Sequence, residues 1–170
     1  MCTLPKVLGG DVAGTVLEAD PGSRFQPGAA VYSCTEGFQL WKPWGTYAEQ
    51  AAVPEAHLAL KPAAASFEEA AGLPLAALTA WQALDAARIE PGQRLLVHAG
   101  AGGVGSLAVQ MAKARGAHVT ATCSTRNLAF VRELGADEAV DYTSQRFEEV
   151  CSPFDAVIDL VGGEYEMRCV

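Results

Sequence analysis

The sequence contains no long hydrophobic run, no cluster of basic residues and no paired cysteines. No apolar run approaches the ~18 residues that a membrane-spanning helix needs. The 20 acidic and 12 basic residues give a net charge of −8 without a Lys/Arg cluster, which excludes the electrostatic footprint of a nucleic-acid-binding protein. The 5 cysteines stand singly, without a C-x-x-C motif, and indicate neither a disulfide framework nor a zinc knuckle. These absences predict a soluble globular protein of a reducing intracellular compartment.

An acidic residue is also missing where a glycine motif leads us to expect one. Residues 100–105 read GAGGVG and fit G-x-G-x-x-G, the glycine spacing of a dinucleotide-binding loop. Such a loop is normally followed, about 20 residues later, by an Asp or Glu that binds a ribose hydroxyl. Residues 121–127 read ATCSTRN and contain no acid. The motif is therefore either accidental or serves a cofactor that needs no acid there.

The first part of the chain has the pattern of a β-rich domain. Short apolar segments, separated by the turn signals D-P-G and Q-P-G, predict strands over residues 11–19, 29–33 and 46–53. Residues 66–89 are rich in Ala and Leu and predict two helices, which Pro74 separates. Ser66 and Glu69 have the spacing of a capping box and mark the start of the first helix.

From residue 94 onward, predicted strands alternate with predicted helices. The strands are expected over residues 94–99, 118–123, 138–142 and 154–161, and the helices over residues 103–115 and 126–135. The predicted buried face of the first of these helices is formed by Val104, Leu107, Ala108 and Met111. Strands that alternate with helices imply βαβ crossovers and a parallel sheet. The predicted fold class is α/β, with the first four strands of a Rossmann-type sheet and part of a β-rich domain.

The surroundings of the glycine motif are those that a dinucleotide-binding loop requires, with a strand before it and a helix and second strand after it. Gly100 allows a tight turn, Gly102 lets the backbone approach a pyrophosphate, and Gly105 lets the helix pack close to the strand. The free N–H groups at the start of the helix then face the phosphates. We therefore expect a cofactor site rather than a merely structural turn.

The missing acid favours NADPH over NADH as that cofactor. A carboxylate at the end of the second strand would repel a 2′-phosphate, whereas neutral hydroxyls and a nearby base bind it. Ser124, Thr125 and Arg126 follow the predicted second strand. Ser124 can donate a hydrogen bond to the phosphate, and Arg126 can pair with its charge. The alternative is that residues 124–127 only cap the next helix, with Arg126 in solvent.

A longer stretch around the loop resembles a known family. Residues 92–113, GQRLLVHAGAGGVGSLAVQMAK, resemble the signature of the quinone oxidoreductase and zeta-crystallin family within the medium-chain dehydrogenase/reductase superfamily. Further landmarks of this family are found, in the same order, at residues 8–16, 45–50, 70–84 and 134–142. The resemblance covers nearly the whole chain, and the nearest subgroup is that of the organellar alkenal/enone and quinone oxidoreductases.

The resemblance implies a two-domain enzyme with its cofactor in the cleft between the domains. Residues 1–62 would be part of a GroES-like catalytic barrel, residues 63–93 connecting helices, and residues 94–170 the N-terminal part of an NADP-binding Rossmann domain. In this family NADPH donates a hydride to a quinone or to the activated C=C bond of an α,β-unsaturated carbonyl compound.

The resemblance also implies positions for the cofactor and the substrate. Ala101, Gly103 and Val104 would contact the pyrophosphate, together with the glycines of the loop. Ser124 and Tyr142 would lie at the 2′-phosphate and adenosine, Thr79 near the nicotinamide, and the backbone of residues 160–162 beside its ring. Four aromatic residues are substrate-pocket candidates that otherwise pack the barrel and its loops, namely Tyr32, Phe38, Trp41 and Trp44.

Some family features are absent or displaced. Zinc-dependent relatives place a His at the position of Gly10 and a Cys at that of Leu75, so we expect no metal here. Relatives often carry a Lys one position beyond Arg126, where this chain has Asn127. No shared acid–base group marks the zinc-free branch, so the catalytic residues stay unassigned; positioning of cofactor and substrate is expected to dominate.

Compared with this family, the chain is about half-length, and we expect it to be truncated at both ends. Strand 154–161 would then be an unpaired edge of the sheet. Two functions stay open: an NADPH-dependent reductase of which this is a fragment or short form, or a non-catalytic chain that binds NADPH or a partner protein. The full-length form is expected to be a monomer or homodimer in the cytoplasm, a plastid or a mitochondrion. The intact mass of the natural protein would distinguish the two functions.

Overall fold

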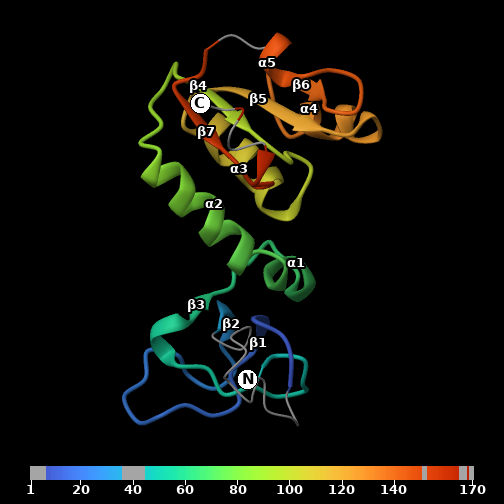
Figure 1. The fold of residues 1–170 in the computed structure, drawn as a ribbon. Coiled ribbons are helices and arrows are strands. Elements are labelled where there is room, and N and C mark those ends of the chain that lie inside the picture. Colours follow the sequence, from blue (N-terminus) through green and yellow to red (C-terminus); the bar gives the residue numbers. More distant parts are fainter. Residues whose placement is uncertain (1–6, 36–44, 151–152, 165–167, 169–170) are drawn as a thin grey trace. The chain divides into compact units, whose positions relative to one another are not determined.

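A computed structural model describes residues 7–35, 45–150, 153–164 and 168 of the chain (Figure 1). The chain divides into two units, Met1–Leu75 and Ala76–Val170, and each is described by itself. The finer division predicted above, with boundaries at residues 62 and 93, stays a prediction.

The first unit is built on an antiparallel sheet in the order β1-β2-β3. Its strands are β1 (Asp11–Thr15), β2 (Ala30–Cys34) and the short β3 (Ala59–Leu60), which follows the 3-10 helix η2 (Glu55–His57). β1 and β2 pair along their whole length, from Asp11 opposite Cys34 to Thr15 opposite Ala30. The two strands predicted from the apolar segments on either side of the D-P-G and Q-P-G turns therefore form a hairpin.

The prediction of a strand over residues 46–53 is wrong, because these residues form no strand. The N–H groups of Thr46 and Tyr47 donate to the backbone carbonyls of residues 8–9, but the N–H of Ala48 turns back to the Thr46 carbonyl at 2.8 Å. The segment bends there and joins no ladder. Tyr47 is 80% exposed, so the apolar alternation does not mark a buried face.

The two helices predicted after the sheet are present and begin where the sequence signals place them. α1 (Phe67–Ala71) starts at a capping box, in which Glu69 N–H donates to Ser66 Oγ at 3.1 Å and Ser66 N–H donates to Glu69 Oε2 at 2.8 Å. α2 (Pro74–Ala86) begins at Pro74, which has no N–H to leave unpaired in a first turn.

The second unit contains the predicted parallel sheet, with strand order β6-β5-β4-β7. Its strands are β4 (Arg94–Val97), β5 (His118–Cys123), β6 (Glu138–Asp141) and β7 (Ala156–Ile158). The order places the first two strands of the unit side by side, with the third and fourth outside them, which is the arrangement of a Rossmann-type sheet. The predicted α/β class is therefore confirmed, although β7 is shorter than the predicted strand 154–161.

Helices cover both faces of this sheet. Its connections hold α3 (Gly103–Ala114), η3 (Thr125–Asn127), α4 (Leu128–Glu133) and the short α5 (Phe147–Val150). α3 packs on the face that carries Leu95 and Val97, whereas Phe147 of α5 packs with Leu96 on the opposite face. Figure 1 shows α3 against the strands. Alternate residues of β4 thus belong to two separate cores.

The buried face of α3 is made of smaller residues than predicted. Ala108 is fully buried as expected, but its buried neighbours are Gly105, Val109 and Ala112. The three other residues of the predicted face, Val104, Leu107 and Met111, are only partly buried. Glycine and alanine allow the helix axis to lie close to the sheet, so larger side chains occupy the flanks of the contact.

Candidate cofactor site

The glycine loop begins with a tight backbone turn at the carboxyl end of β4. Ala99 has φ 51°, in the left-handed region that residues other than glycine adopt at a cost of about 1–2 kcal/mol. Its carbonyl accepts a hydrogen bond from Gly102 N–H at 2.9 Å. The N–H of Gly100 donates to the Thr122 carbonyl, also at 2.9 Å. These bonds close the turn and attach it to β5.

Two glycines of the loop have no room for a side chain. A Cβ atom on Gly105 would overlap the carbonyl oxygen of Ala99 and lie 2.9 Å from Gly100 Cα. A Cβ atom on Gly100 would lie 2.7 Å from the Cβ of Ala121 in β5. On Gly103, by contrast, such an atom meets nothing within 4 Å. Gly105 therefore lets α3 approach the loop, and Gly100 lets the loop approach β5.

The N-terminus of α3 offers backbone donors at this edge of the sheet. Gly102 is its N-cap and has no side chain to accept from the first turn, which contains no acidic residue. Ala101 lies in the preceding turn, and Gly103 and Val104 begin the helix. The first N–H groups of an α-helix have no acceptor within the helix and carry partial positive charge. This end of α3 therefore fits an anionic group such as a pyrophosphate.

The neighbouring strand β5 ends in the hydroxyl and basic residues predicted for a 2′-phosphate site. Ser124 is the N-cap of η3, but its side chain makes no capping hydrogen bond and instead accepts from Asn127 Nδ2 at 3.3 Å. Arg126 is exposed and forms no ion pair with another described residue. Residues 124–127 thus start a helical turn, as in the alternative interpretation, while Ser124 and Arg126 stay available to a ligand.

An acid that was not predicted from the sequence lies one strand further along. Asp141 ends β6, where it pairs with Cys123, and its carboxylate accepts from Thr125 Oγ1 at 2.6 Å and from Thr143 Oγ1 at 2.7 Å. These hydrogen bonds, first that of Thr125 and then those of Thr143, lower the pKa of Asp141. The carboxylate is buried, and its oxygens accept from hydroxyl groups of its own chain. In the sequence, the hydroxyl residues Thr125 and Thr143 are the feature that indicates such hydrogen bonds to Asp141.

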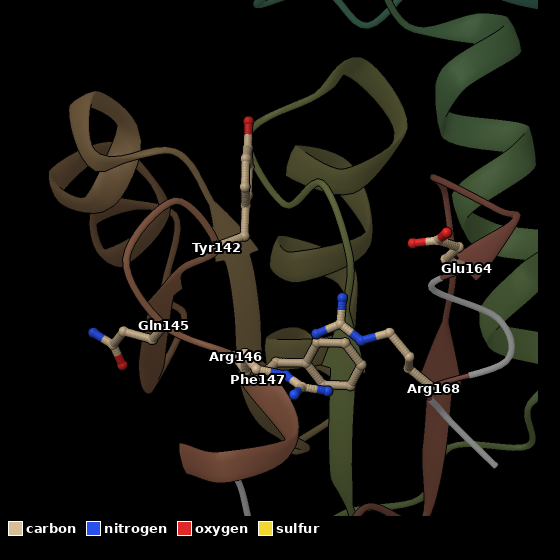
Figure 2. Close-up of a pocket in the computed structure, with 6 residues that line it drawn as sticks. All are labelled: Tyr142, Gln145, Arg146, Phe147, Glu164 and Arg168. Carbon is tan, nitrogen blue, oxygen red and sulfur yellow. The ribbon is translucent and has the colours of Figure 1, made fainter.

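Tyr142 follows β6 and is 50% exposed. It lines a pocket of about 320 Å³, together with Gln145, Arg146, Phe147, Glu164 and Arg168 (Figure 2). Arg168 lies over the Phe147 ring, 4.9 Å from its centroid, and forms a two-bond ion pair with Glu148 at 2.5 and 2.6 Å. The glycine loop, Ser124 and Arg126 do not line this pocket, so Tyr142 is the one predicted cofactor residue at its wall.

The remaining predicted residues belong to other elements of the chain. Thr79 is an exposed residue of α2, and Tyr32 is a half-buried residue of β2 in the first unit. Trp41, Trp44 and the neighbouring Phe38 fall outside the described residues. The substrate-pocket candidates therefore stay predictions.

Burial raises the pKa of two cysteine thiols. The pKa of Cys34 is raised to about 11 by burial and then by the nearby Asp11 carboxylate. Burial, followed by the charge of Asp141, also raises the pKa of Cys123. A thiol with a raised pKa holds little thiolate at neutral pH and is a poor nucleophile.

Within the described parts of the chain, no three His, Cys, Asp or Glu side chains come together in a way that could hold a metal ion. In the same residues, no helix has the length and apolar composition needed to cross a membrane.

Two family models match the chain in the order of its two units. The model of the alcohol dehydrogenase GroES-like domain matches residues 1–63, and the model called zinc-binding dehydrogenase matches residues 103–168. A GroES-like domain followed by a Rossmann-type sheet with a glycine loop defines a medium-chain dehydrogenase/reductase.

Within this class, the chain is similar to several reductases and quinone oxidoreductases. The 2-methylene-furan-3-one reductase of Solanum lycopersicum is 42% identical over 98% of this chain and 45% of its own. The chloroplastic NADPH-dependent alkenal/one oxidoreductase of Arabidopsis thaliana is 43% identical over 94% of this chain and 42% of its own. The solved quinone oxidoreductase of Coxiella burnetii superposes with a TM-score of 0.89, at 39% identity, over 98% of this chain and 53% of its own.

The chain belongs to the quinone oxidoreductase, or zeta-crystallin-like, family of the medium-chain dehydrogenase/reductases. The resemblance noted in the sequence is thereby confirmed. The chain spans about half the length of the curated relatives it matches.

Proposed function

We propose that the chain binds NADPH and takes part in reducing a quinone or the activated C=C bond of an α,β-unsaturated carbonyl compound. One observation carries the proposal. The donor-rich N-terminus of α3 follows β4, and Ser124 and the exposed Arg126 follow the adjacent parallel strand β5, at the carboxyl edge where such sheets bind nucleotides.

The residues present fit a phosphorylated dinucleotide. Gly102 brings no side chain between the backbone and a pyrophosphate, which the N–H groups of Gly103 and Val104 would hold. The Ser124 hydroxyl and the Arg126 guanidinium would hold the 2′-phosphate. The other proposed contacts are Gly100, Ala101 and Gly105 at the loop, Tyr142 at the adenosine, and Thr79 and residues 160–162 at the nicotinamide. NADPH, when bound, supplies the hydride.

The exposed cation of Arg126 supports NADPH over NADH, because it is the exposed charge nearest the end of β5 in the chain. The carboxylate of Asp141 lies at the neighbouring strand end and is hydrogen-bonded to the hydroxyls of Thr125 and Thr143. These hydrogen bonds lower its pKa and keep it ionised, and they use its oxygens as acceptors within the chain rather than for a ribose hydroxyl. The Arabidopsis relative is named as an NADPH-dependent enzyme, which agrees with this preference.

The acceptor and the cellular setting are proposed from the relatives. Their names include an alkenal/one oxidoreductase, a furanone reductase and a quinone oxidoreductase, which share a conjugated carbonyl acceptor. We propose an intracellular location, in the cytoplasm or an organelle, and a monomer or homodimer. A substrate wall that includes Tyr32, Trp41 and Trp44 stays a prediction. So does independence of zinc, which the residues Gly10 and Leu75 support.

Charge reversal at Arg126 tests the cofactor assignment. We expect Arg126→Glu to weaken NADPH binding at least about tenfold, because it replaces a charge-assisted hydrogen bond with repulsion, and to leave NADH binding nearly unchanged. Arg132→Glu is the matched control, since Arg132 is also exposed, lies in the following helix α4 and changes the net charge equally. Isothermal titration of both cofactors into the wild type and the two variants gives the six dissociation constants. If Arg126→Glu loses the same affinity for NADPH and for NADH, Arg126 does not contact the 2′-phosphate.

Turnover tests the reaction itself. NADPH oxidation is followed at 340 nm with a benzoquinone or a short enone, using the 170-residue chain and any longer natural form that contains it. Oxidation by either form supports the reductase. NADPH binding without oxidation by both forms would favour the alternative, a non-catalytic NADPH-binding chain.

A further inference from the structure

Thr122 of β5 and His98 form a buried polar pair beneath the glycine loop. Thr122 is 1% exposed and His98 is fully buried. Thr122 Oγ1 and His98 Nδ1 lie 3.0 Å apart, within hydrogen-bond distance. Neither residue is among the proposed cofactor contacts. Polar side chains removed from water in this way destabilise a fold unless they are hydrogen-bonded, so their partners indicate what the pair does.

The first partner of the pair is the backbone of Ala99. Thr122 Oγ1 accepts a hydrogen bond from Ala99 N–H at 3.3 Å, and the Thr122 carbonyl accepts from Gly100 N–H at 2.9 Å. Ala99 is the residue with φ 51°, where the chain turns from β4 into the loop. Thr122 thus holds, with its side chain and its backbone, the two residues that set the direction of the loop.

The position of α3 depends in turn on Ala99. The Ala99 carbonyl accepts from the N-cap residue Gly102, and the same carbonyl is in direct contact with Gly105, where a Cβ atom would overlap it. A rotation of Ala99 away from its left-handed conformation would displace this carbonyl from the N–H of Gly102 and from its contact with Gly105. The N–H groups that begin α3 are therefore aligned only while Ala99 keeps its conformation.

His98 completes the arrangement by fixing the Thr122 hydroxyl. Thr122 Oγ1 accepts from Ala99, so its own hydrogen can be donated to Nδ1 of a neutral imidazole. Burial lowers the pKa of His98, which keeps the ring neutral. Phe147 packs edge-on against the imidazole, with ring centroids 4.6 Å apart, and holds its orientation.

We propose that Thr122, oriented by His98, is a positioning residue that sets the affinity of the chain for the pyrophosphate of its dinucleotide by holding Ala99 in the left-handed conformation. The inference rests on the proposed function. Thr122 does not touch the cofactor. It determines the fraction of molecules whose loop is in the binding conformation, and the apparent dissociation constant rises as this fraction falls.

Three variants separate this role from general stability. Thr122→Val keeps the shape of the side chain and removes its hydroxyl, whereas Thr122→Ser keeps the hydroxyl. Thr120→Val is the matched control, because Thr120 is equally buried in the same strand and its hydroxyl is 3.5 Å from Glu138, away from the loop. A fourth variant, His98→Leu, removes the imidazole partner of the Thr122 hydroxyl.

Binding is measured for NADPH and for 2′-AMP, a probe that carries the 2′-phosphate and lacks the pyrophosphate. We expect Thr122→Val to weaken NADPH binding about three- to tenfold, as loss of a buried hydrogen bond would, and to leave 2′-AMP binding unchanged. His98→Leu is expected to weaken NADPH binding less, and Thr122→Ser and Thr120→Val to bind like the wild type. Unchanged NADPH binding in Thr122→Val, or equal losses for both ligands, would overturn the proposal.

Hydrogen exchange of the Ala99 amide gives a second readout without any ligand. We expect this amide to exchange about tenfold or more faster in Thr122→Val than in the wild type or Thr120→Val, because it loses its acceptor. An unchanged exchange rate would overturn the positioning role. If the wild type binds no NADPH, the proposed function fails. The exchange rate of the Ala99 amide in Thr122→Val then still tests whether Thr122 holds the loop.

Discussion

Replacing Gly105 by alanine tests the contact on which the glycine loop and α3 depend. The added Cβ atom would overlap the Ala99 carbonyl oxygen and lie 2.9 Å from both the Ala99 carbonyl carbon and Gly100 Cα. All three atoms belong to the backbone, and Gly100 is itself hydrogen-bonded to β5. They cannot rotate away as the end of a flexible side chain could, so α3 must move.

The size of the effect follows from these distances. A separation of 2.9 Å is about 0.6 Å shorter than the ordinary distance between carbon atoms in contact. Moving α3 outward by that amount would loosen the packing of Ala108, Val109 and Ala112, which are all fully buried. Overpacking of this kind costs about 1–3 kcal/mol, and the better helix propensity of alanine returns at most about 1 kcal/mol. We expect a net loss of about 2 kcal/mol.

The assay is urea unfolding followed by far-ultraviolet circular dichroism, with Gly103→Ala as the control. Gly103 lies in the same turn of α3, and a Cβ atom there meets nothing within 4 Å. Gly103→Ala should therefore be as stable as the wild type or slightly more so. If Gly105→Ala is as stable as Gly103→Ala, α3 does not approach the loop as closely as described and the reasoning is refuted.

Three further predictions concern pH and metal. Burial lowers the pKa of His98 below its unfolded value of 6.5, so the unfolded chain binds the proton first as the pH drops. The free energy of unfolding should therefore fall below about pH 6.5, and it should fall less steeply in His98→Asn. Equal slopes of this free energy against pH, measured by urea titration, would contradict the prediction. The pKa of Glu148 is lowered from 4.5 to about 2, first by the hydrogen bonds of Arg168 and then by a backbone N–H and Arg146. The stabilisation lost in Arg168→Met should therefore be constant from about pH 7 to pH 5 and shrink below about pH 4.5. A difference that persists undiminished to about pH 3 would count against it. Dialysis against a chelator should leave NADPH binding unchanged, because Gly10 and Leu75 replace the zinc ligands of relatives; a loss that zinc restores would disprove this.

The second unit could be predicted in detail because its signals are local and agree with one another. The apolar strands, the glycine turn and the amphipathic helix follow in the order of a βαβ unit, and each has the period of its element. The capping box at Ser66 is equally local, since both of its hydrogen bonds join residues three positions apart. Such features are encoded within a few residues, so one sequence suffices to find them.

Features that depend on distant residues could not be predicted. Residues 46–53 alternate like a strand, but a strand also needs a partner along its length, and the backbone turns back at Ala48. The carboxylate of Asp141 is occupied by Thr125, 16 residues away. The hydrogen bond from Ala99 to Thr122 spans 23 residues. The last two contacts follow from sheet register, which the order of residues alone does not specify.

The central claim is that the glycine loop and the end of β5 together hold the two phosphate groups of NADPH. Backbone amide chemical shifts, recorded while NADPH is titrated into the isotopically labelled chain, test it most directly. The account predicts that the largest shifts occur at residues 102–105 and 124–126, and that NADH reproduces the first set without the second. Shifts confined to other residues, or identical shifts at Arg126 with both cofactors, would contradict it.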